Sequence, residues 1–135
     1  MDRRVFLDAS FWISLRNEHD MYHVRSRETL GMLMRRQVIL FTTAFVLAET
    51  QAAFSRSRAR SLQIINEFQS NPVLRSERTT PEDEEKALDM IRTHADKSFS
   101  FCDTLSFTVM TRLGIHRVLS LDDHFRQIGR FEVIH

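Results

Sequence analysis

Cysteine, glycine and proline are scarce in this chain, and it has no long apolar run. Its 135 residues include one cysteine, three glycines and two prolines. The single cysteine, Cys102, excludes an internal disulfide and fits a reducing compartment. No apolar stretch reaches the roughly 18 residues that a membrane span needs, and the N-terminus lacks the apolar core of a signal peptide. We therefore expect a cytoplasmic protein that does not associate with membranes.

Lysine is also rare, because seventeen of the nineteen basic residues are arginine. Guanidinium groups form bidentate bonds that suit phosphate and carboxylate partners. The densest basic stretches are 55–60, with the sequence SRSRAR, and the pair Arg35 and Arg36. A genomic preference for arginine explains most of these positions equally well, and charge runs are usually solvated faces. The arginine excess and the net charge of +1 therefore leave the partner open.

Short β-rich runs alternate with helical patterns along the chain. We expect strands at 4–8, 38–43, 73–77, 117–121 and 131–134, and helices at 21–37, 44–56, 59–69, 81–94 and 101–113. This alternation indicates a parallel sheet covered on both faces, so the predicted class is α/β, with three α/β/α layers around four to five parallel strands. No low-complexity linker interrupts the pattern, and residues 1–135 are expected to form one domain.

Four acidic residues occupy positions that such a fold brings to one edge of its sheet. Asp8 and Asp122 follow the first and fourth predicted strands. Glu49 lies on the helix that leaves the second strand, and Asp103 lies near the start of the helix before the fourth. Ligands of open parallel sheets bind beyond the carboxyl ends of the strands, where the strand order reverses. We therefore expect these carboxylates to converge.

Local roles compete with this interpretation for most of the acids. Asp103 follows Ser100 by three residues, and Asp123 follows Ser120 by three, so both pairs fit a helix capping box. Asp8 could cap the turn after its strand. These alternatives need no ligand, and for Asp103 alone they are as good as the functional one.

Glu49 is harder to explain as a structural residue. Its helical neighbours three and four residues away are apolar or small, namely Phe45, Val46, Ala52 and Ala53. This pattern predicts a buried carboxylate, which costs several kcal/mol unless a cation meets it. An arginine would serve, but clustered carboxylates are best explained by a hard divalent cation with oxygen ligands. We therefore expect Mg²⁺ or Mn²⁺ and the hydrolysis of a phosphodiester.

The segments VFLDAS, VLAET, SFSFCDTLSF and VLSLDDHF occur in this order along the chain. With them the sequence resembles the PIN-domain ribonucleases, and within that family the VapC-type toxins of toxin–antitoxin pairs, from Arg4 to the terminal FRQIGRFEVIH. The resemblance implies a flavodoxin-like or Rossmann-like sheet, a metal-dependent endoribonuclease and a single-stranded RNA substrate. It also implies a small antitoxin protein as partner, and a homodimer.

The resemblance also assigns roles to individual residues. The acids that match its motifs are Asp8, Glu49, Asp103 and Asp122. We expect Asp8 and Asp103 to bind the metal directly, and Glu49 and Asp122 to act through water or to orient the nucleophile. The family implies products with a 5′-phosphate and a 3′-hydroxyl. Supporting positions are Ser10 and Ser120, which match small hydroxyl residues, Asp123, which is expected to cap a helix, and Lys97, which could contact a substrate phosphate.

Two other functions fit the same sequence. One is a PIN domain without activity that binds RNA or acts as a scaffold, and the other is a metal-dependent phosphatase for small molecules. A zinc site at His19 and His23 lacks a third ligand at a suitable spacing. His124, beside the acidic pair, is best explained as a histidine at a helix start, with contact to a substrate phosphate as the alternative.

Overall fold

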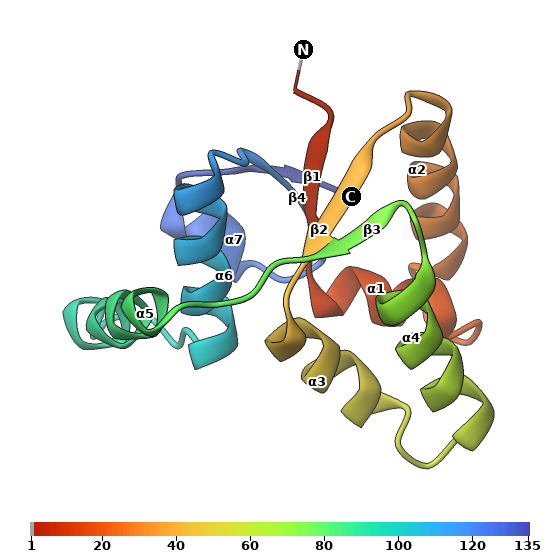
Figure 1. Ribbon diagram of the computed structural model, residues 1–135, viewed down its shortest axis with the longest axis horizontal. Helices are drawn as coiled ribbons and strands as arrows, with labels where there is room; N and C mark the ends of the chain where they lie inside the picture. The colour runs from red at the N-terminus through yellow and green to blue at the C-terminus, as the bar shows by residue number, and fades with distance from the viewer. Residues whose placement is uncertain (1) are drawn as a thin grey trace.

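A five-stranded parallel sheet forms the centre of the computed structural model, which describes residues 2–135 (Figure 1). The strands are β1 (Arg4–Leu7), β2 (Ile39–Thr42), β3 (Leu74–Ser76), β4 (Arg117–Leu119) and β5 (Glu132–Ile134). Their order across the sheet is β3-β2-β1-β4-β5, and all four neighbouring pairs are parallel. All five predicted strands are present, each somewhat shorter than its sequence pattern.

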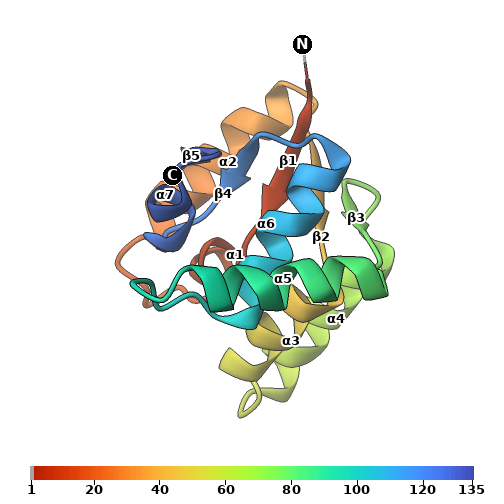
Figure 2. The ribbon, with the colours of Figure 1, turned by 90° about the vertical axis from the view of Figure 1, so that its left-hand side faces the viewer.

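Helices cover both faces of this sheet, which confirms the three-layer α/β/α class. In Figures 1 and 2, α5 and α6 lie on one face and α2 lies on the other. The seven helices of the described chain are α1 (Ala9–Arg16), α2 (His23–Arg35), α3 (Ala44–Ala53), α4 (Arg58–Ser70), α5 (Pro81–Thr93), α6 (Phe101–Leu113) and α7 (His124–Ile128). None of the helices in residues 2–135 has the length and apolar character that crossing a bilayer requires.

The core is built around the central strand and α6. Val5, Phe6 and Leu7 of β1 are at most 2% exposed, because a central parallel strand is covered on both faces. Residues 102–110 of α6 are all buried as well. Thr108 satisfies its hydroxyl within this helix by donating to the carbonyl oxygen of Thr104, at 2.8 Å. The buried length of α6 gives the acid at its start a rigid support.

Helix ends follow the signals in the sequence. The hydroxyl of Thr43 accepts a hydrogen bond from the amide of Val46 at the start of α3, as threonine commonly does at the residue before a helix. Helix α6 ends at Gly114, whose φ of 70° is the left-handed conformation that glycine adopts without strain. Because Ser100 caps its start and Gly114 its end, α6 has the bounds that the sequence predicts.

An ion pair between a buried carboxylate and an exposed guanidinium joins α6 to α5. The Arg112 guanidinium donates to both carboxylate oxygens of Asp83, with Nη2–Oδ2 at 2.9 Å and Nε–Oδ1 at 3.0 Å. Burial raises the pKa of Asp83, but the hydrogen bonds from Arg112 and Thr80 together outweigh it, so the pKa is lowered overall. The Asp83 side chain is 3% exposed and depends on Arg112 for its charge compensation.

Candidate active site at the carboxyl edge of the sheet

The strand order reverses between β1 and β4. From β1 the chain adds β2 and β3 on one side, and later adds β4 and β5 on the other. Asp8 follows β1 directly and Ser120 follows β4 directly, and the Asp8 amide donates to the carbonyl oxygen of Leu119 at 3.1 Å. Residues more than a hundred positions apart in the sequence therefore meet at the switch point, where parallel sheets bind ligands.

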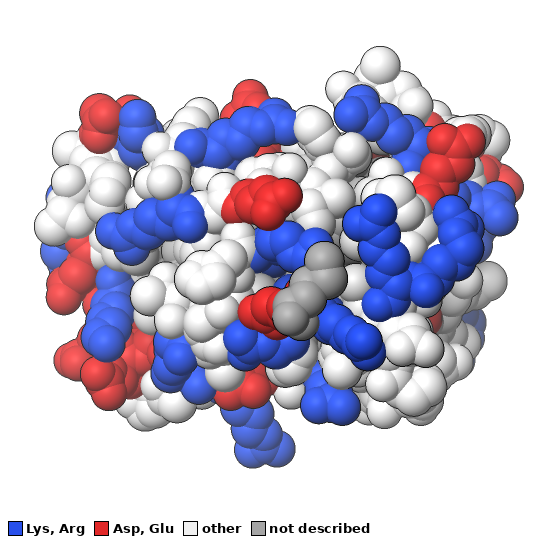
Figure 3. All heavy atoms as spheres, turned by 90° about the horizontal axis from the view of Figure 1, so that it is seen from above, with Lys and Arg blue, Asp and Glu red and all other residues white. Residues whose placement is uncertain are grey.

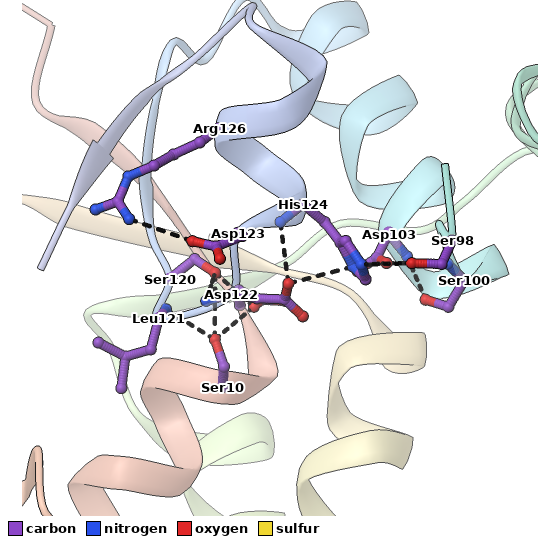
Figure 4. A network of polar contacts seen from close by, with 11 residues as sticks. Ser10, Ser98, Ser100, Asp103, Ser120, Leu121, Asp122, Asp123, His124 and Arg126 are labelled. Atoms are coloured by element: carbon purple, nitrogen blue, oxygen red, sulfur yellow. Dashed lines mark hydrogen bonds and ion pairs between the residues drawn. The ribbon is translucent and has the colours of Figure 1, made fainter. Parts of the chain in front are cut away.

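Two serine hydroxyls hold the buried carboxylate of Asp8, which is 4% exposed. Its Oδ2 accepts hydrogen bonds from Ser10 Oγ at 2.7 Å and from Ser120 Oγ at 2.8 Å. The same hydroxyl oxygens accept from backbone amides, Ser10 from Leu121 at 2.9 Å and Ser120 from Asp122 at 3.1 Å (Figure 4). The predicted supporting serines thus bind the acid and the loop after β4 at once.

This arrangement leaves the second oxygen of Asp8 without a hydroxyl partner. A serine hydroxyl has one proton, and both protons go to Oδ2. No side chain among residues 2–135 donates to Asp8 Oδ1. Burial raises the pKa of Asp8, and the negative charge of Asp103 raises it further, while the bonds from Ser10 and Ser120 oppose the rise. Ionised Asp8 therefore lies in a site that favours an additional cation.

Asp103, Asp122 and His124 form a compact group of possible metal ligands beside Asp8. One ligand atom from each lies within 4.8 Å of the others. His124 Nδ1 is 2.6 Å from Asp103 Oδ2 and 3.2 Å from Asp122 Oδ1. Asp103 Oδ2 also accepts from the Ser100 amide at 2.9 Å, so the predicted capping box of α6 is confirmed. The cap and the convergence are compatible, because a carboxylate has lone pairs for both.

Glu49 approaches this group from α3, but its predicted burial is wrong, because the residue is exposed. Val46 and Thr50 form the buried side of α3, whereas Ala52 and Ala53 are exposed. The small residues near Glu49 were therefore no sign of a covered face. The carboxylate stands at the open side of the site, where substrate and water have access.

The electrostatics nevertheless place the Glu49 carboxyl with the other acids. Desolvation raises the pKa of Glu49 most, and the charges of Asp8, Asp103 and Asp122 raise it further, whereas a contact with the Cys102 thiol opposes the rise. Partial exposure and desolvation coexist because one side of the carboxyl faces protein and the other faces solvent. The charges of the three predicted aspartates therefore act on Glu49 at this edge of the sheet, although Asp8 and Glu49 do not belong to the compact group of Asp103, Asp122 and His124.

The two remaining predicted residues lie outside the group. Asp123 precedes α7 without forming the predicted capping box, because Ser120 Oγ accepts from the Asp122 amide instead. Its exposed carboxylate faces Arg126 at 3.5 Å. Lys97 pairs with Asp96 at 3.2 Å in the loop before α6, and within residues 2–135 it makes no ion pair with the acid group. Of the doubled aspartates, Asp122 is the one in the group, as its position predicted.

His124 is the member that sequence reasoning set aside. It is the first residue of α7, so its description as a histidine at a helix start is correct. Its ring nevertheless reaches both Asp103 and Asp122. The signal that pointed to it is its place two residues after Asp122, where the Asp122 carboxylate accepts the His124 amide at 3.0 Å.

Arginines gather at the opposite edge of the sheet. Figure 3 shows this face, at the amino ends of the strands, with Lys and Arg side chains over much of it and Asp and Glu side chains between them. Arg4 and Arg117 begin β1 and β4, and Arg35 ends α2. These arginines lie at the end of the sheet away from the acid group.

Comparison with known proteins gives this fold and site a family. The family model for the PIN domain matches residues 5–131, and the chain belongs to the PIN domain family. A search of curated proteins finds the 23S rRNA-specific endonuclease VapC20 of Mycobacterium tuberculosis, strains H37Rv and CDC 1551. Each is 29% identical over 130 residues, which cover 96% of this chain and 97% of the relative.

Solved structures agree with this assignment. The crystal structure of Mycobacterium tuberculosis VapC20, described as a sarcin-ricin loop cleaving toxin, matches with a TM-score of 0.88 and 28% identity, over 97% of this chain and 99% of that one. VapBC2 from Rickettsia felis, bound to a DNA fragment from its promoter, shares the fold with a TM-score of 0.68 at 15% identity, over 97% of both chains. The predicted resemblance to VapC-type PIN domains is confirmed.

Proposed function

We propose that this protein is a Mg²⁺- or Mn²⁺-dependent endoribonuclease and the toxin of a toxin–antitoxin pair. The observation that carries the proposal is the group of Asp103, Asp122 and His124 at the carboxyl edge of the sheet, with the charge of Asp103 acting on the buried Asp8 and the charges of the three aspartates acting on Glu49. Two carboxylates about 4 Å apart repel by roughly 4 kcal/mol at an effective dielectric near 20. A site that accumulates such repulsion fits a divalent cation with oxygen ligands.

The unpartnered atoms support the fit of a metal. Asp8 Oδ1 has no hydroxyl donor, and His124 Nδ1 is buried without a well-directed hydrogen bond among the described residues. Asp8, Asp103 and Asp122 would hold the ion. A bound ion would supply an activated water and would neutralise negative charge on the phosphate.

The chain's own residues have distinct tasks in this reaction. Ser10 and Ser120 fix the orientation of Asp8 through its Oδ2, and the α6 cap fixes Asp103. Glu49 is accessible and its pKa is raised by desolvation and by the neighbouring acids, which makes its carboxylate a better acceptor for a proton from water. The water oxygen forms a bond to phosphorus, the bond from phosphorus to the 3′ oxygen breaks, and the 3′ oxygen takes up a proton. The products are a 5′-phosphate and a 3′-hydroxyl.

We propose single-stranded RNA as the substrate, and a ribosomal RNA loop as the first candidate. The support is the named activity of VapC20, which matches 96% of this chain. An open acidic edge with an exposed Glu49 accommodates an unpaired backbone better than an enclosed pocket would. A sarcin-ricin loop oligonucleotide is therefore the substrate of choice for the first assay.

Cleavage of that oligonucleotide tests the proposal. The wild type should cut it in the presence of Mn²⁺ and leave it intact with excess EDTA, and Asp8→Asn should be inactive. Asp123→Asn is the matched control, because it removes a neighbouring carboxylate that lies outside the group. Cleavage of a chromogenic phosphomonoester with no cleavage of RNA would favour the phosphatase. RNA binding without cleavage at any metal concentration would favour the scaffold.

Two partners belong to the proposal as well. A small antitoxin would silence the site, most simply by placing a basic side chain among the acids. Expression of the wild type alone should arrest growth, whereas Asp8→Asn should be harmless, and normal growth with both would contradict the toxin role. The predicted homodimer stays a prediction, and analytical ultracentrifugation of the purified protein tests it.

A further inference from the structure

His124 presents a buried nitrogen to two carboxylates without a proper hydrogen bond. Its Nδ1 is closed to solvent and has no well-directed partner in the part of the chain that the structure describes. Asp103 Oδ2 and Asp122 Oδ1 nevertheless lie 2.6 and 3.2 Å away. A contact this short that fails as a hydrogen bond approaches away from the N–H direction. The imidazole is therefore within ion-pair distance of the acids without a hydrogen bond to either of them.

The surroundings of the ring fix its orientation. On the far side, Nε2 lies 3.4 Å from Ser98 Oγ, and the Phe99 ring packs against the imidazole edge to face, with centroids 5.6 Å apart and planes at 86° (Figure 4 shows Ser98 and His124). With the proton on Nε2, the ring donates to Ser98, and Nδ1 keeps its lone pair for a partner other than the two carboxylates. Metal-binding histidines commonly use their second nitrogen in this way.

The two carboxylate oxygens of the group can also bind a cation. Asp103 Oδ2 and Asp122 Oδ1 each accept one backbone amide, from Ser100 and from His124, which leaves each oxygen a further lone pair. The three ligand atoms lie within 4.8 Å of one another. Adjacent ligands of an octahedral ion with bonds of about 2.1 Å lie about 3 Å apart, close to the 2.6 and 3.2 Å that separate Nδ1 from the two carboxylate oxygens. Small side-chain shifts would therefore bring all three atoms onto one ion.

We infer that His124 is a nitrogen ligand of the metal ion through Nδ1, and that this ligand makes the site prefer Mn²⁺ to Mg²⁺. The inference deepens the proposed function and rests on its metal centre. Imidazole suits transition metals, whereas carboxylates and water alone suit Mg²⁺. A purely acidic site would bind both ions through oxygen, so the histidine adds selectivity that the four acids do not provide.

Electron spin echo spectroscopy of the Mn²⁺ complex tests the assignment directly. The wild type should show the ¹⁴N coupling of a bound imidazole, and His124→Phe, which keeps the aromatic contact with Phe99, should lose it. His116→Phe is the matched control, because His116 is exposed at the start of β4, on the opposite edge of the sheet. His124→Asn is a second variant, which replaces the ring nitrogen with a small polar group.

Metal affinity provides the second measurement. In both His124 variants the affinity for Mn²⁺ should fall by at least about tenfold, while the affinity for Mg²⁺ changes by less than about threefold. Bound Mn²⁺ without nitrogen coupling in the wild type overturns the inference and leaves metal-dependent RNA cleavage intact. Failure of Mn²⁺ to bind overturns both the inference and the metal dependence. If the His124 variants lose affinity for Mn²⁺ and Mg²⁺ equally, the histidine does not make the site prefer Mn²⁺.

Discussion

Replacing Asp8 with asparagine should stabilise the metal-free protein while it removes RNA cleavage. Asparagine has the shape of aspartate, and its carbonyl oxygen can accept the hydroxyls of Ser10 and Ser120 as Oδ2 does. Its amide group then lies where Asp8 Oδ1 was, near the negative charge of Asp103. The variant therefore keeps the hydrogen bonds of the site and removes the buried charge.

The sign of the effect depends on pH. The pKa of Asp8 is raised in the folded protein, mainly by burial, so the native state binds this proton more tightly than the unfolded chain. The stability of the wild type is therefore complete below about pH 4 and falls as the pH rises through the folded pKa, by about 1.4 kcal/mol for each unit of difference. Asp8→Asn lacks this loss. It should exceed the wild type in stability at pH 7 and match it near pH 3.

Metal should reverse the order of the two proteins. At a Mn²⁺ concentration of 100 times Kd, binding stabilises the wild type by about 2.7 kcal/mol, which corresponds to roughly 10 °C in melting temperature for a chain of this size. Thermal melts with and without Mn²⁺ at pH 7 measure both effects, with Asp123→Asn as the control that should follow the wild type. An equal Mn²⁺ shift in Asp8→Asn would refute Asp8 as a ligand. If metal-free Asp8→Asn is less stable than the metal-free wild type, the charge of Asp8 does not destabilise the folded protein.

Three further variants test other parts of the structure. Glu49→Gln should reduce cleavage by at least about 100-fold in a single-turnover assay, with a change in stability of no more than about 0.5 kcal/mol because the residue is exposed. Ser100→Ala removes the α6 cap and should cost about 1 kcal/mol in urea unfolding, with weaker Mn²⁺ binding. Arg112→Ala leaves Asp83 buried and unpaired, so it should cost about 2–3 kcal/mol above pH 4 and progressively less as acid protonates Asp83, whereas Arg126→Ala, at an exposed pair, should cost less than about 1 kcal/mol.

Most of the secondary structure was predictable because local signals agree with burial. The strand runs are continuous and apolar where both faces are covered, as in β1. Ser100 and Gly114 mark both ends of α6 in the sequence and in the structure. The short helices α1 and α7 received no bounds, since eight and five residues give too few turns for a periodic pattern.

The site was predictable in its members and less so in its geometry. The meeting of Asp8 with Ser120 depends on β4 pairing with β1, a long-range choice that no local pattern specifies. Glu49 was predicted to be buried because small neighbours resemble a packed face, yet small residues are equally compatible with an open one. The spacing of Ser120 and Asp123 fits a cap, but the hydroxyl of Ser120 is committed to Asp8 and to the Asp122 amide. Competition for a single hydroxyl is visible only in three dimensions.

The position of β4 in the sequence also determines when the site can form during synthesis of the chain. Asp8 is translated more than a hundred residues before its hydroxyl partner Ser120 and the nearby Asp122. Domains fold as the chain emerges, and here the half-sheet of β1, β2 and β3 must wait for the strand that completes the catalytic edge. The proposed site is therefore incomplete until β4 has been made, which would give a freshly made antitoxin time to reach the chain.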